Sequence, residues 1–296
     1  MSEERPVVVV GGHSRLGQEI MHLLEARGQA IARRGDDRFE TVVVPDYHAI
    51  TAAHFAGAAA IVNCTGLVSG SQEALHQANA VLPALLAARS REAGVRRFVQ
   101  VSSFSVYGHA EEVGLETPEH PVSDYGRTKL AGDRALEAAS SDRFEPVLLR
   151  IPMLFDGSSD GKLAKLLRLV VRTRMAPAPK REVVRAMLSY QSAAAVILSL
   201  VDSDRRGVVL AADPTPFTYD LVAERAGEVL GRRIRRVPVP ALAGRALEWL
   251  RPELYASLLK SSRLPNAANF VRETPPEAAL PAVITRLVEK MASGSA

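Results

Sequence analysis

The sequence has little cysteine, few aromatic side chains and a small charge imbalance, and each shortage excludes a class of protein. A single cysteine, Cys64, excludes a disulfide framework and any metal site built from several cysteines. Aromatic residues make up only 5% of the chain and do not alternate with basic residues, as a base-stacking surface requires. The 37 basic and 33 acidic residues give a net charge of +4, which is too small to indicate a nucleic-acid partner.

Long apolar segments are also missing. The longest, from Ala186 to Val201, is interrupted by Ser189, Gln191 and Ser192 and is too short to span a membrane. Glu3 and Glu4 precede a short valine run near the amino terminus, which is too acidic a pattern for a signal peptide. We therefore expect a cytoplasmic protein without a membrane partner, and the single cysteine agrees with a reducing compartment.

Up to residue 150 the sequence alternates short apolar runs with helical stretches, which is typical of a parallel sheet with helices on both faces. The predicted strands are residues 7–10, 29–33, 41–44, 59–63, 98–101 and 146–150. Between the strands, apolar residues recur at helical spacing from Leu16 to Leu24 and from Val81 to Leu86. Beyond residue 150 the rhythm changes, with a cationic helix over residues 162–174, a strand over 207–211 and proline-rich turns.

A glycine-rich turn follows the first predicted strand, in Val7-Val-Val-Val-Gly-Gly-His-Ser-Arg-Leu-Gly17. Gly11 allows a sharp turn, Gly17 allows close packing of the next helix, and the helix amino terminus between them suits a pyrophosphate. Ser14 stands where a middle glycine is usual, and it can cap the helix or bind phosphate. The alternative is a tight strand-to-helix turn without a ligand.

The second predicted strand ends in Arg33 and Arg34 instead of an acidic residue. A carboxylate at this place holds the ribose 2′-hydroxyl of NAD, whereas arginine suits the 2′-phosphate of NADP. We therefore expect NADP(H) in preference to NAD(H), with solvated arginines as the alternative. Asp46, after the third strand, is predicted either to reach the adenine or to cap a helix.

Tyr125 and Lys129 lie four residues apart on one predicted helix, so the ammonium can lie beside the phenol or a bound ribose. A nearby positive charge lowers the pKa of a phenol, which would make Tyr125 a general acid and base. Upstream, the serine-rich stretch around Ser103 and Ser105 follows the fifth strand and places hydroxyls at the carboxyl edge of the sheet, where ligands of open α/β folds bind.

Taken together, these motifs resemble the extended short-chain dehydrogenases/reductases, the NAD-dependent epimerase/dehydratase superfamily. The pattern is most similar to sugar-nucleotide 4-ketoreductases and epimerases, and it covers nearly the whole chain. The stretches that carry the resemblance are Asn79–Arg89, Gly94–Gly108, Tyr125–Asp133 and Leu148–Pro152.

The resemblance implies a Rossmann-type doubly wound parallel sheet with a smaller, intertwined carboxyl-terminal domain. Residues 1–150, with 188–212 returning to them, are the expected dinucleotide-binding domain. Residues 151–187 and 213–296 are the expected substrate-binding domain. Family members often dimerise through two long helices, which would here span residues 75–93 and 125–139, so a homodimer is expected.

The resemblance also implies the roles of individual residues. Ser103 hydrogen-bonds the substrate oxygen, with Ser102 as the rival for this role, Tyr125 exchanges the proton, and Lys129 holds the ribose and tunes Tyr125. Arg185 contacts an anionic substrate, and Ser105 is a further substrate contact. Beyond the glycine turn and the arginines, the expected cofactor contacts are His13, Arg15, Leu16, Asp46, Tyr47, Cys64, Thr65, Gly66, Asn79, Tyr125, Lys129, Pro152 and Met153.

Departures from the family pattern bear on the substrate. Met153 replaces an asparagine that epimerases often use to bind substrate, and Ser189 and Ser192 replace a usual His and Asp. No acidic pair follows Ser103, so dehydration is not expected. The leading hypothesis is NADP(H)-dependent reduction of a ketone, a 4-keto (6-deoxy) sugar nucleotide.

The alternatives are an NAD-dependent UDP-sugar 4-epimerase, a ketoreductase of a non-nucleotide substrate, and a non-catalytic NADPH-binding sensor or assembly protein. The seven histidines show no metal-ligand spacing, so no metal is expected. The cationic stretch over residues 162–174 is expected to be a solvated helix face, and Trp249 is expected to pack between the domains.

Overall fold

The computed structural model describes residues 5–250 and 252–294, which divide into two compact units. Unit 1 contains Met1–Gly108, Leu115–Pro152 and Ala193–Ala211. Unit 2 contains His109–Gly114, Met153–Ser192 and Ala212–Ala296. Each unit is therefore assembled from three separate stretches of chain.

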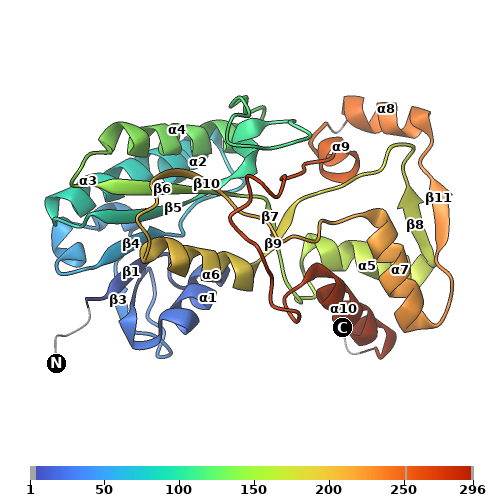
Figure 1. Ribbon diagram of the computed structural model, residues 1–296, viewed down its shortest axis with the longest axis horizontal. Coiled ribbons are helices and arrows are strands. Elements are labelled where there is room, and N and C mark those ends of the chain that lie inside the picture. The colour runs from blue at the N-terminus through green and yellow to red at the C-terminus, as the bar shows by residue number, and fades with distance from the viewer. Residues whose placement is uncertain (1–4, 251, 295–296) are drawn as a thin grey trace. The chain divides into compact units, whose positions relative to one another are not determined.

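Unit 1 is built on a seven-stranded sheet in which neighbouring strands are parallel, in the order β10-β6-β5-β4-β1-β2-β3 (Figure 1). The strands are β1 (Val7–Val10), β2 (Gly28–Ala32), β3 (Thr41–Val43), β4 (Ala60–Asn63), β5 (Arg97–Ser103), β6 (Glu145–Ile151) and β10 (Gly207–Leu210). The expected doubly wound parallel sheet is confirmed. Strand order reverses between β1 and β4, and the carboxyl ends at such a switch point are where open α/β sheets bind ligands.

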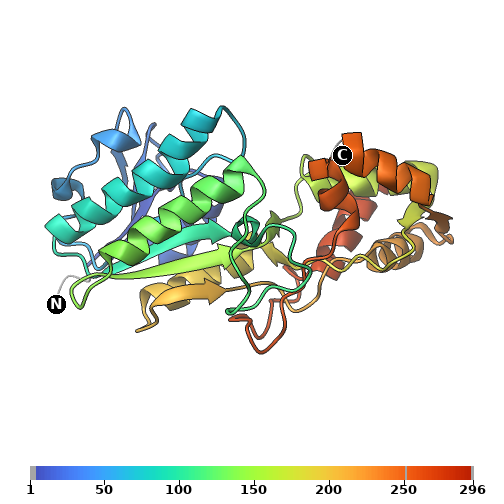
Figure 2. The same cartoon turned by 90° about the horizontal axis from the view of Figure 1, so that it is seen from above.

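Helices cover both faces of this sheet. α1 (Arg15–Leu24) and most of α6 (Tyr190–Val201) lie on one face, and α2 (Gln72–His76), α3 (Leu82–Glu92) and α4 (Asp124–Ala139) lie on the other (Figures 1 and 2). Strands covered on both sides must be apolar throughout. The four valines of β1 are accordingly all buried.

The long helix predicted over residues 75–93 is not regular. α2 and α3 are separated by one π-helical turn, η4 (Gln77–Val81), which brings the side chain of Asn79 inward. α4 packs closely against this turn because Gly132 has no side chain: a Cβ at Gly132 would lie 2.1 Å from the Asn79 carbonyl oxygen. The prediction of one continuous helix is wrong here, because a π turn leaves no mark in apolar spacing. A homodimer through these helices stays a prediction.

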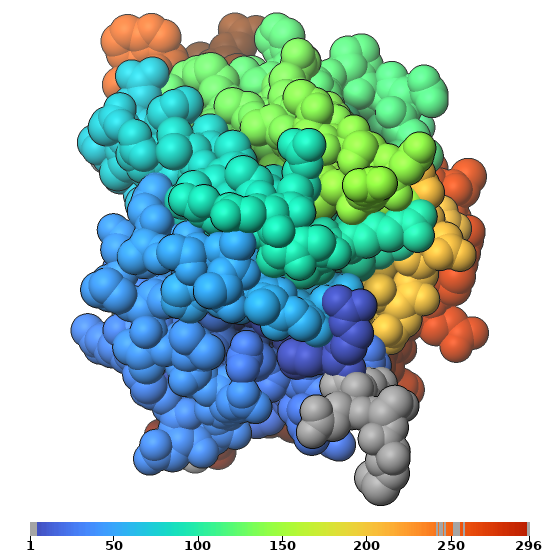
Figure 3. Space-filling view, turned by 90° about the vertical axis from the view of Figure 1, so that its left-hand side faces the viewer, coloured from blue at the N-terminus to red at the C-terminus, as the bar shows by residue number. Residues whose placement is uncertain are grey.

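The amino-terminal edge of the sheet is closed by polar contacts. Arg97, at the start of β5, donates to the carbonyls of Ser203 and Arg205, and Glu145, at the start of β6, pairs with Arg206. Figure 3 shows this side of unit 1, with the residues before β6 beside those before β10. The open loops of the sheet are therefore those at its carboxyl edge.

Unit 2 holds two short parallel strand pairs and five helices within its described residues. β7 (Met153–Phe155) pairs with β9 (Met187–Ser189), and β8 (Met175–Ala178) pairs with β11 (Arg235–Pro238). The helices are α5 (Lys162–Thr173), α7 (Tyr219–Leu230), α8 (Ala241–Leu250), α9 (Pro252–Leu259) and α10 (Leu280–Ala292). The apolar core of unit 2 is formed mainly by α5, α7 and α10.

Two expectations about unit 2 have different outcomes. α5 buries its apolar stripe and leaves Lys162, Lys165, Arg168 and Arg172 exposed, so its cationic face is solvated as expected. Trp249, expected to pack between the domains, is instead 83% exposed on α8, and that expectation is wrong. None of the helices in the described ranges is long and apolar enough to cross a membrane.

Candidate cofactor and catalytic site

The turn after β1 is built from glycines that tolerate no side chain. Gly11 has a φ of +81°, and its N–H donates to the Ile31 carbonyl on β2. A Cβ at Gly12 would lie 2.6 Å from the Cβ of Ala30, and one at Gly17 would lie 2.4 Å from the Gly11 carbonyl oxygen. Gly11 and Gly17 were predicted from the motif, whereas Gly12 was not, because its packing against β2 leaves no signal there.

α1 begins directly after this turn. The Ser14 hydroxyl accepts the Gly17 N–H and caps the helix, whose amino terminus lies at the carboxyl end of β1. Arg15 is exposed and Leu16 is buried, so they lie on opposite sides of the first turn. The ring of His13 hydrogen-bonds the Thr41 hydroxyl of β3. A helix amino terminus offers N–H groups and a positive dipole end to an anion, so this turn fits a pyrophosphate.

Arg33 and Arg34 are both exposed after the end of β2. The Arg33 guanidinium lies 5.7 Å from the ring centroid of Tyr47, which follows β3. Asp46 accepts the His48 N–H and caps the short helix η2 (Tyr47–Ala49), which matches the capping alternative. Hydrogen bonds from His48 lower the pKa of Asp46, so it stays ionised beside Arg33.

The end of β4 continues the same edge. Cys64 and Thr65 are half-buried and Gly66 is exposed. Gly66 has a φ of +154°, and a Cβ there would lie 2.9 Å from Oδ1 of Asn79 and 3.9 Å from Nζ of Lys129. The Asn79 side chain accepts the Leu67 N–H and donates to the Leu67 carbonyl, which holds this loop. Burial raises the pKa of the Cys64 thiol to about 12, so it is no nucleophile.

Two neighbouring serines at the end of β5 point in opposite directions. Ser102 is buried and donates to Asp133 on α4. Ser103 is half-buried, donates to Oγ of Ser105, and forms a hydrogen bond with the phenol of Tyr125. Alternation along the strand thus directs Ser103, and not its rival Ser102, toward Tyr125.

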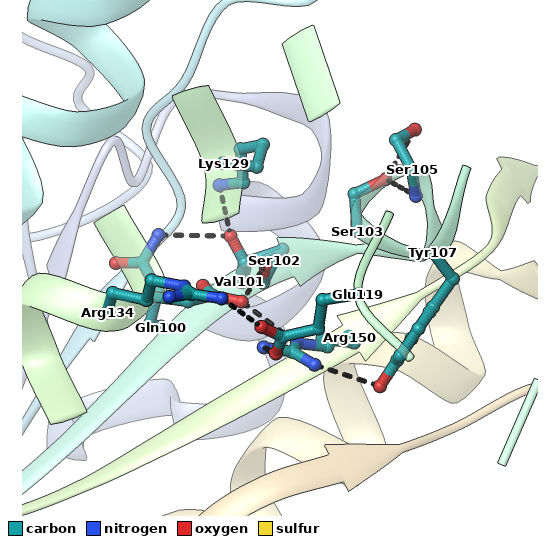
Figure 4. Close-up of polar contacts among 11 residues, drawn as sticks. Gln100, Val101, Ser102, Ser103, Ser105, Tyr107, Glu119, Lys129, Arg134 and Arg150 are labelled. Carbon is teal, nitrogen blue, oxygen red and sulfur yellow. Dashed lines mark hydrogen bonds and ion pairs between the residues drawn. The ribbon is translucent and has the colours of Figure 1, made fainter. Parts of the chain in front are cut away.

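Lys129 follows Tyr125 by one turn of α4, and its side chain is almost completely buried. Its ammonium donates to the Val101 carbonyl at 2.6 Å, an acceptor that it shares with Gln100 (Figure 4). Burial lowers the pKa of Lys129, and the charge of Asp133 opposes this.

The pKa of Tyr125 differs from the expectation. Burial raises it, the hydrogen bond with Ser103 lowers it, and the charge of Asp133 raises it further. The Lys129 ammonium is directed at Val101 instead, and the expected lowering of the Tyr125 pKa is therefore not found. Tyr125 holds its proton more firmly than an exposed tyrosine.

A buried ion network lies behind these residues, and the sequence analysis missed it. Arg150 on β6 is only 2% exposed and donates from Nε to Asp133, from Nη1 to the Tyr107 hydroxyl and from Nη2 to Glu119 (Figure 4). Burial disfavours the charge of Arg150, but Asp133 and the hydrogen bonds to Tyr107 and Glu119 outweigh it and raise its pKa. The available signal was an arginine inside an otherwise apolar buried strand, which requires a buried anion.

The remaining predicted residues lie beyond β6 or in unit 2. Pro152 follows β6, and Met153 begins β7, where its side chain packs against the unit 2 core. Arg185 donates from Nη1 to the Ala256 carbonyl, and burial lowers its pKa. Its role toward a substrate stays a prediction. Among the described residues no cluster of His, Cys, Asp or Glu could hold a metal ion.

Unit 1 therefore brings the predicted cofactor residues to one edge of the sheet. Gly11–Gly17, Arg33, Tyr47 and Cys64–Gly66 follow the carboxyl ends of adjacent strands β1, β2, β3 and β4. The turn fits a pyrophosphate, the arginines fit a phosphate on the adenosine ribose, and Lys129 lies beside Gly66. These residues fit a dinucleotide.

Comparisons with known proteins point the same way. Residues 7–179 match the NAD dependent epimerase/dehydratase family. The uncharacterized protein y4nL of Sinorhizobium fredii is 29% identical over 154 residues, which are 49% of this chain and 43% of that protein. UDP-glucose 4-epimerase of Vibrio cholerae is 26% identical over 165 residues, 52% of this chain and 50% of that protein. The chain thus spans about half the length of the curated relatives it matches.

Solved structures extend the likeness to the whole fold. The UDP-Glc/GlcNAc 4-epimerase of Campylobacter jejuni has a TM-score of 0.73 at 14% identity, covering 98% of this chain and 100% of that one. UDP-glucuronic acid 4-epimerase of Bacillus cereus, solved in complex with NAD, has a TM-score of 0.74 at 12% identity, covering 97% and 99%. At such identities the likeness concerns the fold, but the sequence match covers more than half of the chain. The chain belongs to the NAD-dependent epimerase/dehydratase family of enzymes.

Proposed function

We propose that this protein interconverts nucleotide sugars that differ in configuration at C4, using a bound NAD(P) cofactor. The observation that carries the proposal is the hydrogen bond between the Tyr125 phenol and Ser103, with the buried Lys129 one turn along the same helix. The match to an epimerase sequence and the likeness to epimerase structures support this alternative better than the ketoreductase that we expected first.

The proposed chemistry uses a proton and a hydride. The dinucleotide supplies hydride acceptance and donation when bound. Tyr125 removes the proton from the substrate O4 hydroxyl and later returns it, while Ser103 donates a hydrogen bond to the same oxygen as negative charge develops there. Because burial raises the pKa of Tyr125, the proton transfer requires a positive charge nearby, and Lys129 is the buried cation of α4.

A second candidate, an NADPH-dependent reductase of a 4-keto sugar nucleotide, is favoured by one specific observation. Arg33 and Arg34 are exposed at the end of β2, where a carboxylate for the NAD ribose is absent. We propose that the protein prefers NADP(H) through these arginines. Replacing both by Ser should lower NADPH affinity about tenfold or more and leave NADH affinity unchanged. Equal NADPH binding by both proteins would contradict this assignment.

Product analysis separates the candidates. Each epimer of UDP-glucose and of UDP-N-acetylglucosamine is incubated with the enzyme and oxidised cofactor, and the products are identified by NMR. An epimerase yields the same mixture from both epimers without net change in reduced cofactor. A reductase instead consumes NADPH stoichiometrically with a 4-keto sugar nucleotide and leaves the UDP-sugars unchanged. If neither reaction occurs although NADPH binds, the non-catalytic sensor becomes the better description.

Substitution of Tyr125 tests the mechanism. Tyr125→Phe should lower kcat by about 10²–10⁴ and leave cofactor affinity within twofold, because the phenol acts on the substrate proton. Tyr255→Phe is the matched control, since that ring lies in unit 2 beside Lys260 and takes no part in the proposed chemistry. Full activity of Tyr125→Phe would refute the proposed role.

A further inference from the structure

Helix α8 exposes an unusual amount of apolar surface. Leu242 is 79%, Trp249 83% and Leu250 64% exposed. Leu242 and Trp249 are seven residues apart and so lie on one helix face, with Arg245 between them. Single exposed apolar side chains are ordinary, but a cluster that includes Trp marks a binding surface.

The elements on either side of α8 in the sequence also expose apolar side chains. Val237 on β11 and Leu258 on α9 are each 37% exposed, and β11 is exposed along its whole length. Figure 1 shows α8, α9 and β11 together at one end of unit 2. The α8 surface is defined here as Leu242, Trp249 and Leu250 with the exposed Arg245. The stretch that leads into α8 adds three exposed arginines, Arg232, Arg233 and Arg235.

The stretch of chain that contains α8 is strongly basic. Residues 231–263 contain eight Lys or Arg and two Glu, a net charge of +6, whereas the whole chain has a net charge of +4. The rest of the chain is therefore net negative. Arg236 pairs with Asp220 of α7, and Glu248 on α8 is exposed. The basic excess of the protein is concentrated where its apolar side chains are most exposed.

We propose that the α8 surface binds the surface of an anionic lipid bilayer, with α8 lying in the plane of the interface. Trp and Leu side chains enter the boundary between headgroups and acyl chains, and arginines extend to the lipid phosphates. Each basic residue near an anionic surface adds to the attraction. We expected no membrane partner from the sequence because no segment is long enough to span a bilayer, but a helix that lies on a bilayer needs no spanning length.

Charge argues against a second copy of the chain as the partner. Most dimers are two-fold symmetric and place the same patch of both subunits against each other. Such a dimer through the α8 surface would bring two segments of +6 together. An anionic bilayer complements both the apolar and the basic part of the surface.

α5 provides an internal comparison. It is also cationic, but its apolar residues Leu163, Leu167 and Val170 are buried in the unit 2 core, which leaves Leu169 as its exposed large apolar side chain. A helix whose apolar stripe is already buried cannot insert into a bilayer. Leu169→Ser is therefore a matched control for Leu242→Ser, an equal change on another cationic helix of the same unit.

Trp249 is the only tryptophan of the chain, so its fluorescence reports on this surface alone. The full-length protein is titrated with vesicles of phosphatidylcholine, with and without phosphatidylglycerol. Anionic vesicles should shift the emission to shorter wavelength, reduce quenching by acrylamide and sediment the protein, and added salt should reverse all three. Arg245→Gln, on α8 itself, should weaken binding roughly fivefold. Leu242→Ser should weaken it severalfold, and Leu169→Ser should leave it unchanged.

Several results would overturn the proposal. One is an unchanged Trp249 emission with no sedimentation on anionic vesicles. Another is equal binding to neutral and anionic vesicles, which would remove the role of the arginines. A blue shift that follows protein concentration without vesicles would identify a second copy as the partner. The wild-type titration decides these outcomes without any variant, and circular dichroism checks that the surface substitutions leave the fold intact.

Discussion

Replacing Arg150 by Met tests the buried network behind the catalytic helix. The Arg150 guanidinium contacts three groups, of which Asp133 is 1% exposed and Tyr107 is 3% exposed. The third, Glu119, is partly exposed and also pairs with Arg134, so it loses little when Arg150 is removed. Asp133 keeps only the hydroxyl of Ser102 as a hydrogen-bond donor, and its carboxylate becomes a poorly compensated buried charge.

The Asp133 carboxylate, left with only Lys129 and Ser102 to stabilise its charge, sets the expected size of the effect. Removing one partner of a buried ion pair costs about 3–5 kcal/mol, so Arg150→Met should lower the free energy of unfolding by about that amount. Adding Asp133→Asn removes the unpaired charge, so the double variant should be at least about 1 kcal/mol more stable than Arg150→Met alone. Arg134→Met, which removes the exposed arginine from the same Glu119, should lower the free energy of unfolding by less than about 1 kcal/mol.

Urea unfolding followed by far-ultraviolet circular dichroism measures these differences. Trp249 fluorescence is unsuitable, because the only tryptophan lies in unit 2 and the network lies in unit 1. The reasoning is refuted if the double variant loses as much as the two single variants together, since the two side chains would then act independently. It is also refuted if Arg134→Met costs as much as Arg150→Met.

Three further predictions concern unit 1. Asp133→Asn removes a charge that raises the pKa of Lys129, so this pKa should fall further below its ordinary value. The alkaline limb of the pH–rate profile should then move to lower pH. An unmoved limb would show that Asp133 does not support the charge of Lys129 during turnover. Gly132→Ala should destabilise the protein by about 1–3 kcal/mol through the clash with Asn79, although alanine favours helices. Ala131→Gly, at an exposed position of the same helix, should cost only about 1 kcal/mol. Thermal unfolding compares the two variants. With a pKa of about 12, the Cys64 thiol should be alkylated about a thousandfold more slowly in the native protein than in urea. Mass spectrometry follows the two rates. Similar rates would show that the thiol is accessible and ionisable in the native protein.

The sheet could be predicted because its strands are buried on both faces. A run such as the four valines of β1 leaves no alternative to a central strand, and the helical spacing between the runs indicates parallel crossovers. Strand ends were less predictable: β5 extends to Ser103, two residues beyond the predicted end, because its last serines still pair with Arg150 and Ile151 of β6. Polar residues at a strand end look like a loop in sequence, although pairing with a neighbour keeps them in the strand.

The candidate site was predictable where a residue acts through its own chemistry. The glycine turn, the arginines after β2 and the Tyr125–Lys129 pair all lie within short stretches whose spacing is visible. Gly12, Gly132 and the pairing of Asp133 with Arg150 depend on what lies across the fold, which no local spacing encodes. The prediction for Trp249 was wrong because a tryptophan is usually largely buried, and only the structure shows that α8 leaves this one exposed.

The distribution of charge links the network to the catalytic helix. Lys129 and Asp133 lie one turn apart on α4, both are buried, and each has its charge disfavoured by burial and stabilised by the other. Arg150 holds Asp133 from β6, and Asp133 in turn supports the charge of Lys129, which contacts the end of β5. Asp133 thus supports the charge of Lys129 one turn from Tyr125, and Glu119 pairs with Arg150 at the outer side of the network. The proton chemistry proposed for Tyr125 accordingly depends on residues that never touch a substrate, and their substitution should change the pH dependence of turnover before it changes cofactor affinity.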